Sequence, residues 1–439
     1  MIRQALRGNP WAFLGPFSTQ LLAAALVAAG LGITTSLGRA PLDAAARRAL
    51  TDSGLADMAV IFVLVAVYLS IIIVGVTMAA TVAQQARDLA LVRAIGATPG
   101  RVRRAVAAQA ALVAVPATLL GVPLGGLGGR AWIHGVVTHD LAPAAVTYHG
   151  HPAALPIALA VTVGTSLAGA LLAAIRPSRM RPAAALAEAG APRRRIGGVR
   201  TIAGLVLVAG GTGLSVSIAG LDAATADALA LFVMLALCVG AGLLGPALLR
   251  VAALAGRAFG DTGRLAGDTI GVRAKALSGA LVPLTLAVAF TAIKVIILKT
   301  AEHRTGAAPP AADRWLEYSG TAIYVAFAAV AAVNTLVTVV LSRRRDLAVI
   351  QLAGATRRRA LAVVICEALL VTGTALVVGA AVAATTTLPM LHTALGTWTP
   401  WVPVGWVVTG VLGTAGLVLA GTALPAALAM RRPPIEVVG

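Results

Sequence analysis

Three side chains with polar chemistry lie inside long apolar runs of this chain: Glu367, Lys294 and Asn334. A carboxylate at the centre of a bilayer costs about 3 kcal/mol unless it is paired or hydrated. We therefore expect Glu367 to pair with a nearby arginine, and Lys294 to extend its ammonium group toward the outer membrane surface. Asn334 suits a hydrogen bond between helices. As intramembrane polar groups, all three are also candidate sites on a route for substrate or protons.

The histidines offer a second possible chemistry, because all six lie in segments that separate apolar runs. His149 and His151 could together chelate a metal ion or sense acid. Neither their spacing nor the neighbouring carboxylates make a recognised zinc site, so we predict no metal centre and interpret the segment as a polar, solvated loop. No Ser-His-Asp arrangement or carboxylate pair is apparent, so no catalytic residue is assigned. The six positions are His134, His139, His149, His151, His303 and His392.

One segment occurs twice, at a constant offset of 258 residues. The first copy runs from Arg87-Asp88-Leu89-Ala90 to Gly96-Ala97-Thr98, and the second from Arg345-Asp346-Leu347-Ala348 to Gly354-Ala355-Thr356. Glycine suits the left-handed turn that ends a helix, and threonine can cap the helix that follows. Each copy therefore predicts an elbow, in which a helix continues out of one apolar run, breaks at Gly-Ala-Thr and restarts toward the next run.

Arginines crowd the helix start that follows each predicted elbow. Cations in the first turn of a helix oppose its dipole, so another interaction must favour them. Lipid phosphates could provide it, and so could an acidic protein surface. The arginines are Arg101, Arg103 and Arg104 in the first copy and Arg357, Arg358 and Arg359 in the second.

Composition then fixes the class of protein. Hydrophobic residues make up 59% of the 439 residues, charged residues 12%, and the mean hydropathy is +0.91. A soluble globular chain does not have this composition, so the protein is predicted to be a polytopic membrane protein. Aromatic residues, at 4%, are too few for a base-stacking surface, so no nucleic acid partner is expected. Cys238 and Cys366 lie in apolar runs and indicate no disulfide framework.

The elements that must position these residues are ten apolar stretches, each about 20 residues or longer and so able to cross a membrane as a helix. We predict an all-α polytopic membrane protein with ten transmembrane helices. The predicted spans cover approximately residues 12–36, 58–83, 105–127, 153–175, 201–220, 228–249, 277–298, 319–341, 360–385 and 403–430.

The distribution of charge predicts the orientation of these helices. With the N-terminus in the cytoplasm, the cytoplasmic segments hold 27 of the 35 basic residues. Lysine and arginine accumulate on the cytoplasmic side of short loops. Both termini are therefore predicted to be cytoplasmic, and the elbows with them.

The repeat also predicts the domain organisation, because four spans surround each copy of the elbow. Residues 1–190 are predicted to form a first four-helix repeat and residues 263–439 a second, with a two-helix insert at residues 191–262. The two repeats would enter the membrane in the same direction, as a parallel repeat. Gln109 stands where Glu367 stands in the second repeat, so the two halves differ there.

The pattern Arg-Asp-Leu-Ala-Leu-Val-Arg-Ala-Ile-Gly-Ala-Thr and its second copy, with Cys366-Glu367-Ala368-Leu369-Leu370 after it, resemble the core signature of FtsX-like permeases. The ten-helix arrangement is similar to that of bacitracin-export-type permeases. This resemblance implies that the elbows, within residues 89–104 and 347–359, dock on the ATPase subunit of an ABC transporter. The residues that it assigns to this coupling are Leu89, Arg93, Gly96, Ala97, Thr98, Arg101, Leu347, Gly354, Ala355, Thr356 and Arg357.

No nucleotide site is recognisable in the chain, because none of its three lysines follows a phosphate-binding loop. The chain itself is therefore not expected to be an enzyme or to bind a cofactor. ATP and Mg would be bound by a separate ABC ATPase, with two copies for each permease chain because the chain carries two elbows. Membrane lipids are the other expected partner.

One departure from many members of the family bears on function. Those members carry a large extracytoplasmic domain after the first helix of a repeat, whereas here these connections are only residues 37–57 and 299–318. We therefore expect no lipoprotein-releasing or periplasm-spanning activity.

Three functions remain open. The leading one is a permease subunit that exports or extracts an amphipathic or lipophilic compound, such as an antimicrobial or a lipid, across a bacterial cytoplasmic membrane. The second is a mechanotransmission or signalling subunit that acts on an outer partner. The third is an ion-coupled secondary transporter, for which Glu367 is the sole candidate group.

Overall fold

The structure is a computed structural model, and it describes residues 11–52, 55–179, 197–221, 223–352 and 354–431. All regular secondary structure in these ranges is helical, as predicted. The chain divides into two compact units. Unit 1 comprises residues 1–192 with 310–320, and unit 2 comprises residues 193–309 with 321–439. The predicted division into two repeats and an insert stays a prediction, and both chain termini lie outside the described residues.

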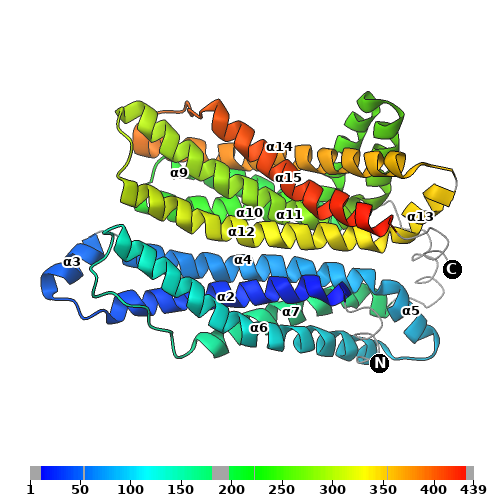
Figure 1. Cartoon of the computed structure of the whole chain (residues 1–439), viewed down its shortest axis with the longest axis horizontal. Coiled ribbons are helices and arrows are strands. Elements are labelled where there is room, and N and C mark those ends of the chain that lie inside the picture. Colours follow the sequence, from blue (N-terminus) through cyan, green and yellow to red (C-terminus); the bar gives the residue numbers. More distant parts are fainter. Residues whose placement is uncertain (1–10, 53–54, 180–196, 222, 353, 432–439) are drawn as a thin grey trace. The chain divides into compact units, whose positions relative to one another are not determined.

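Unit 1 is built from four long helices and two short ones (Figure 1). A short helix, α3, connects α2 to α4, and the short helix α5 connects α4 to α6. Buried residues of α2 and α7, among them Ala24, Val27 and Ala158, form a small hydrophobic core. The helices are α2 (Trp11–Arg39), α3 (Ala44–Asp52), α4 (Leu55–Gln84), α5 (Ala86–Ala94), α6 (Pro99–Thr138) and α7 (Ala154–Arg179).

Unit 2 has a similar order of four long helices and one short helix after a pair of additional helices, but no helix corresponds to α3 in the described connection between α11 and α12. Its main core joins residues of α10, α11, α12, α14 and α15, with Leu249, Leu281, Leu336 and Val418 at its centre. The first ten residues of α12 group with unit 1. The elements are α9 (Gly198–Ile218), α10 (Ala223–Ala255), η1 (Gly256–Phe259), α11 (Gly260–Thr305), α12 (Ala311–Ser342), α13 (Arg344–Leu352), α14 (Arg357–Leu395) and α15 (Val404–Ala429).

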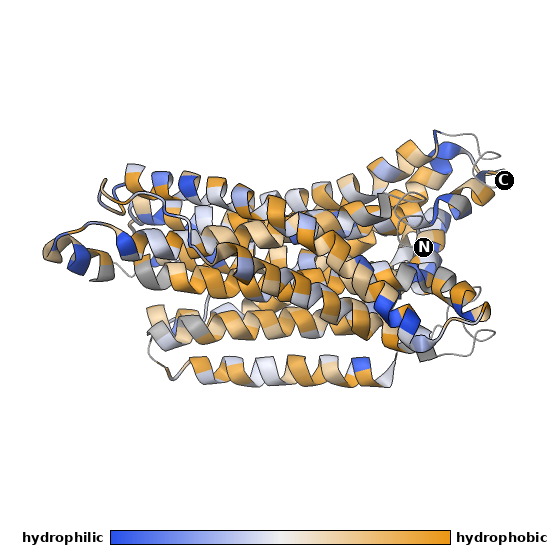
Figure 2. Cartoon of the chain, turned by 90° about the horizontal axis from the view of Figure 1, so that it is seen from below, coloured by the Kyte–Doolittle hydropathy of each residue, from blue (hydrophilic) through white to orange (hydrophobic). Residues whose placement is uncertain are grey.

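The described helices agree with the predicted membrane spans. Nine apolar helical stretches are long enough to cross a membrane in the described part of the chain, and one of them, Leu229–Thr305, contains both α10 and α11. Hydrophobic residues dominate the middle of the long helices, while hydrophilic residues gather toward the helix ends (Figure 2). Each of the ten predicted apolar stretches therefore lies on its own helix.

The connection between α10 and α11 corrects one sequence-based expectation. We expected a basic loop between residues 249 and 277, but both helices extend through it and meet at η1. Gly260, with φ of 67°, reverses the chain. A Cβ on Gly263 would lie 2.3 Å from the Gly256 carbonyl oxygen, and one on Gly267 would lie 2.5 Å from that of Ala253. The two helices can approach this closely because these positions carry no side chain.

Glycines also explain the close packing of α2 against α6 in unit 1. Gly121, Gly125 and Gly129 lie four residues apart along one face of α6 and are buried. A Cβ on Gly121 would lie 2.4 Å from the Leu21 carbonyl oxygen, and one on Gly125 would lie 2.2 Å from that of Ala25. Small residues at this spacing let membrane helices bring their backbones together, where dispersion contacts hold them.

A proline in α10 frees a backbone acceptor that Arg200 satisfies. Pro246 has no N–H, so the carbonyl of Gly242, four residues earlier, lacks its helical partner. The Arg200 side chain, from the first turn of α9, donates to this carbonyl at 3.0 Å and to that of Leu243 at 2.9 Å. It also donates to the Ser278 hydroxyl of α11 at 3.0 Å. One guanidinium therefore fastens α9 to the other two helices.

Replacing Gly125 by leucine should separate α2 from α6. The added side chain would meet helix backbone, which cannot move aside as a flexible side chain can, so we expect a loss of about 3 kcal/mol in unfolding free energy. Thermal unfolding of the purified chain measures the loss. Gly128→Leu is the matched control, because no atom lies within 4 Å of its Cβ position. Equal melting temperatures for the two variants would contradict the packing argument.

Arg200 and Pro246 should be energetically coupled. Arg200→Met keeps the apolar stem but removes the donors, and we expect it to cost about 1–3 kcal/mol. In a Pro246→Ala background the residue 246 N–H can bond Gly242, so the same change should cost about 1 kcal/mol less. A double-mutant cycle of unfolding free energies tests this. Strict additivity would show that the proline-freed carbonyl is not what Arg200 stabilises.

Candidate functional site

The two elbows begin at a break that the sequence did not predict. We expected the second helix of each repeat to continue to Gly-Ala-Thr, but α4 ends at Gln84 and α12 at Ser342, and separate helices α5 and α13 follow. Gln85, between α4 and α5, has φ of −81° and ψ of 2°, outside the helical region. Each short helix turns away from the axis of the preceding one (Figure 1). In unit 2 this turn allows α13 to bury Leu347 and Ala348.

Both elbows end in the glycine turn that the sequence predicted. Gly96 has φ of 97° and Gly354 has φ of 95°. The Gly96 N–H donates to the Arg93 carbonyl, and the Ala97 N–H reaches back to that of Val92. Gly354 and Ala355 repeat the pattern with Gln351 and Ile350. This is a Schellman motif, which satisfies carbonyls that the end of a helix leaves without partners.

The returning helices start with the predicted threonine caps. Thr98 and Thr356 have extended backbones, with ψ of 153° and 151°, and each accepts a hydrogen bond from the backbone N–H three residues later at 3.3 Å. Pro99 occupies the first position of α6. The local chemistry is thus the same in both elbows.

Arginine side chains hold the first elbow to the end of α7. Arg93 of α5 donates to the Ser178 carbonyl oxygen at 2.5 Å, and Arg103 of α6 donates to the Ser178 hydroxyl at 3.1 Å. Arg103, which was expected to face lipid phosphates or an acidic surface, and Arg93, which the resemblance assigned to coupling, therefore bind another part of the same unit. Basic side chains commonly satisfy the last carbonyls of a helix in this way.

The second elbow is held by different contacts. Leu347, 6% exposed, packs in a hydrophobic cluster with Val340, Ala360 and Val364. Asp346 of α13 forms an ion pair with Arg273 of α11. Arg357, the first residue of α14, donates to the Ala427 carbonyl near the end of α15 at 2.8 Å.

Glu367 has the arginine partner that we expected. It lies in the third turn of α14, is 4% exposed and pairs with Arg343, which is 5% exposed and lies at the break between α12 and α13. A buried carboxylate is tolerated when a cation with direct hydrogen bonds accompanies it. The pair therefore ties the start of the second elbow to the returning helix.

The outermost residues of both elbows are exposed apolar side chains. Ile95 is 80% exposed and Leu91 48% in the first elbow, and Val349, Ile350 and Leu352 are about half exposed in the second. Arg101, Arg358 and Arg359 are exposed beside them. Each elbow thus presents an apolar tip next to cations.

The other predicted site residues are less exposed. Leu89 is half-buried, as are Ala97 and Ala355. Lys294 on α11 and Asn334 on α12 are also half-buried, and the Asn334 carbonyl accepts a bond from Thr338. Leu347 is buried, so it can contribute to coupling only by seating α13. The roles of all these residues in coupling or transport stay predictions.

The segments that hold the histidines contain several stacked aromatic contacts, while His149 of the predicted solvated loop is exposed. His139 stacks on Trp315, His303 on Trp401 and His392 on Trp398, with ring centroids 4.4–4.5 Å apart. The Tyr148 ring lies where side chains on Gly32 and Gly129 would otherwise stand. Burial raises the pKa of the Tyr148 hydroxyl, and nearby Arg130 partly offsets this rise. No group of three metal-binding side chains occurs among the residues described.

Sequence reasoning missed three residues that hold the elbows in place: Arg343, Arg273 and Ser178. One signal could have found the first of them. Arg343 lies in register with Gln85 at the repeat offset, just as Glu367 lies in register with Gln109. The two glutamines of the first repeat are therefore replaced by an arginine and a glutamate, which can pair, in the second repeat. The partners of Arg93 and Asp346 have no such signal, because they lie on helices distant in sequence.

Comparison with known families finds the same repetition. A family model described as FtsX-like permease C-terminal matches residues 60–182 and again residues 319–434. Each match includes one elbow with the membrane helices on either side of it. Together the two matches cover more than half of the chain. No curated protein matches the sequence.

Alanine at either elbow glycine should strain the turn. No atom lies within 4 Å of the Cβ position at Gly96 or Gly354, so the cost comes from the left-handed backbone, and we expect about 1 kcal/mol for each substitution. Gly100→Ala, in the first turn of α6 and equally open, should be neutral or stabilising. Thermal unfolding of the three variants compares them. A Gly100 variant as unstable as the others would argue against backbone strain.

Proposed function

The chain belongs to the FtsX-like permease family, and from this premise we propose that it is the membrane subunit of an ABC transporter. It is a multi-pass membrane protein, and its family consists of transport subunits that are not themselves enzymes. In our proposal a separate ATPase binds ATP and Mg, docks on the two elbows and drives the movement of their helices.

The exposed apolar tips are the observation that carries this proposal. A large apolar side chain at the end of a short helix, outside the membrane-spanning stretches, is unfavourable in water unless a partner covers it. Ile95 is such a residue in the first elbow and Leu352 in the second. A groove on the ATPase that accepts one short helix would bury either tip.

The arginines beside the tips fit the same partner. Arg101 and Arg359 occupy equivalent positions in the two repeats, and both are exposed near the start of a returning helix. An acidic rim on the ATPase groove would complement them and would speed association. Because these positions lie close to the membrane surface, anionic lipids can also bind them.

Two elbows on one chain suit an ATPase dimer, which offers one docking groove on each subunit. We therefore propose one permease chain for two ATPase subunits. The proposed location is the bacterial cytoplasmic membrane, with the elbows and both termini in the cytoplasm, because the basic residues gather on that side.

The proposed substrate is an amphipathic or lipophilic compound, such as an antimicrobial or a lipid, that is exported or extracted from the bilayer. The outer connections support this, because α2 and α4 are joined by little more than α3, and only residues 306–310 separate α11 from α12. These connections have no room for a substrate-handling domain, so a lipid-soluble compound would enter laterally from the membrane. Efflux and antibiotic resistance would follow for such a substrate.

Co-purification with the ATPase encoded beside this gene tests the proposal. We expect the intact chain in lipid nanodiscs to bind this ATPase and to change its rate of ATP hydrolysis. Ile95→Asp combined with Ile350→Asp should reduce binding at least about tenfold, because a desolvated carboxylate would replace an apolar anchor at each tip.

The control is Val199→Asp, which places the same charge on an 85% exposed valine in the first turn of α9, where the helix dipole favours it. It should bind the ATPase normally. All variants should keep the melting temperature of the unaltered chain. Absence of binding by any ATPase, together with transport that does not require ATP, would overturn the proposal in favour of a secondary transporter.

A further inference from the structure

The two repeats differ at one facing pair of positions. Gln85 and Gln109 of the first repeat precede Arg343 and Glu367 by the same 258 residues that separate the two copies of the elbow motif. The first member of each pair lies at the break before the elbow helix, and the second lies in the third turn of the returning helix. In the second repeat the pair is ionic, and in the first it consists of two neutral amides.

We call the break before each elbow helix, together with the facing turn of the returning helix, the joint of that elbow. In unit 2 the ion pair connects the two sides of this joint. Arg343 and Glu367 are both at least nine-tenths buried and in direct contact. Arg273 of α11 also acts on the Glu367 carboxylate, while it pairs with Asp346 of α13. An ion pair with hydrogen bonds is strong in a low-dielectric setting, and separating its members would leave two uncompensated charges. Bending at this joint therefore carries a large penalty.

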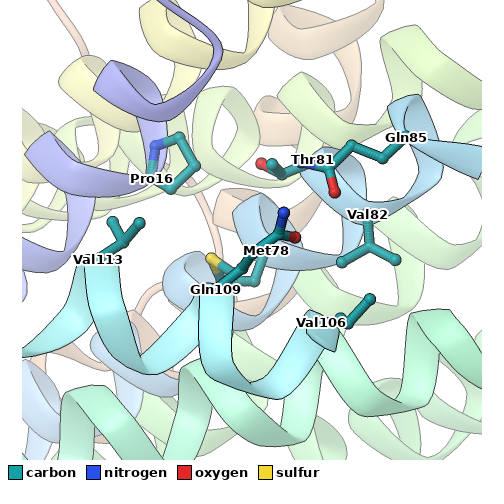
Figure 3. A pocket seen from close by; sticks show the side chains of 8 residues that line it. All are labelled: Pro16, Met78, Thr81, Val82, Gln85, Val106, Gln109 and Val113. Atoms are coloured by element: carbon teal, nitrogen blue, oxygen red, sulfur yellow. The ribbon is translucent and has the colours of Figure 1, made fainter. Parts of the chain in front are cut away.

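In unit 1 the same joint encloses a small pocket. Gln85 and Gln109 both line it, together with Thr81, Met78 and four apolar residues (Figure 3). Its volume is about 10 Å³, roughly the space that one water molecule needs. Within the described structure no hydrogen bond joins the two amide side chains. The described arginine contact of α5, from Arg93 to Ser178, lies at the far end of that helix.

The amide of Gln20, which contacts the pocket residue Met78, has only part of its hydrogen-bonding capacity satisfied. Gln20 of α2 is fully buried, and its amide nitrogen donates to the Met78 sulfur at 3.3 Å. Its carbonyl oxygen has no partner among the described atoms. The Nε atom of Arg343 also has no partner among the described atoms, so the two joints differ in the ion pair itself. Separating that pair is costly, whereas the two amide side chains of unit 1 have no bond to each other to lose.

We propose that the Arg343–Glu367 pair is a clasp that fixes the joint of the second elbow, and that the pocket between Gln85 and Gln109 leaves the joint of the first elbow free to bend. The first elbow then makes the larger movement and the second acts as the fixed support. The bending is a property of the chain alone. Its use in ATP-driven coupling rests on the proposed function.

Hydrogen exchange of the intact chain in nanodiscs, without any ATPase, tests this. We expect amides of α5 to be less protected than those of α13. The variant that combines Arg343→Gln with Glu367→Gln should lower the protection of α13 about tenfold. The variant that combines Gln85→Arg with Gln109→Glu should raise that of α5. Each variant changes both positions, so no charge is left buried without its partner.

The matched control reverses the pair, with Arg343→Glu and Glu367→Arg. It should keep α13 more protected than the amide variant does, because an ion pair is still present even though Arg273 then faces an arginine. Unchanged protection of α13 in the amide variant would overturn the clasp. Unchanged protection of α5 in the transplanted variant would overturn the claim that the missing pair frees it. Because no ATPase is present, either result stands apart from the outcome of the binding experiment.

Discussion

Each helix break or helix end frees backbone carbonyls and N–H groups, which hydrocarbon cannot satisfy where the break lies in the membrane, and the structure of this chain depends on how it satisfies them. At the elbows the glycine turn satisfies carbonyls and the threonine cap satisfies an N–H group. Where Pro246 interrupts α10, Arg200 supplies the missing donor. At the ends of α7 and α15, Arg93 and Arg357 donate to carbonyls of the last helical residues. Several arginines that composition alone would assign to lipid or to a partner are therefore structural donors.

Glycine residues contribute to the attraction between helices. Apolar side chains gain little by leaving lipid for a helix interface that is equally apolar. Close backbone contact must then supply the attraction between helices. Gly121 and Gly125 provide it between α2 and α6, and Gly263 and Gly267 provide it between α10 and α11. The α2–α6 pair is closely packed in unit 1, and α6 continues from it to the first elbow.

The sequence predicted the parts of this fold that depend on local chemistry. The ten apolar stretches, the turns at Gly96 and Gly354 and the caps at Thr98 and Thr356 were predicted because the residues that determine them are neighbours in the chain. The break at Gln85 and Arg343 was missed because neither residue disfavours a helix and the cause is tertiary. Glu367 was expected to find an arginine, but only packing could select Arg343 among those nearby. The glycines of α6 recur every four residues, and this spacing could have predicted the close approach of α2 and α6. The prediction was missed because hydrophobic periodicity alone does not consider glycine spacing.

Some elbow arginines bind within their own unit, and the others remain available to an external surface. Arg93, Arg103 and Arg357 bind within their own unit. Arg101, Arg104, Arg358 and Arg359 are exposed, and their side chains make no hydrogen bond or ion pair to another described residue. Their charge opposes the dipole of the helices they begin, so the chain alone gains nothing from placing them there. Both repeats retain such cations beside an apolar tip, although the contacts that hold the two elbows differ. Beyond the glycine turn and the threonine cap, the two elbows therefore share an exposed surface that consists of an apolar tip and neighbouring arginines. This is expected if the same kind of partner binds each elbow.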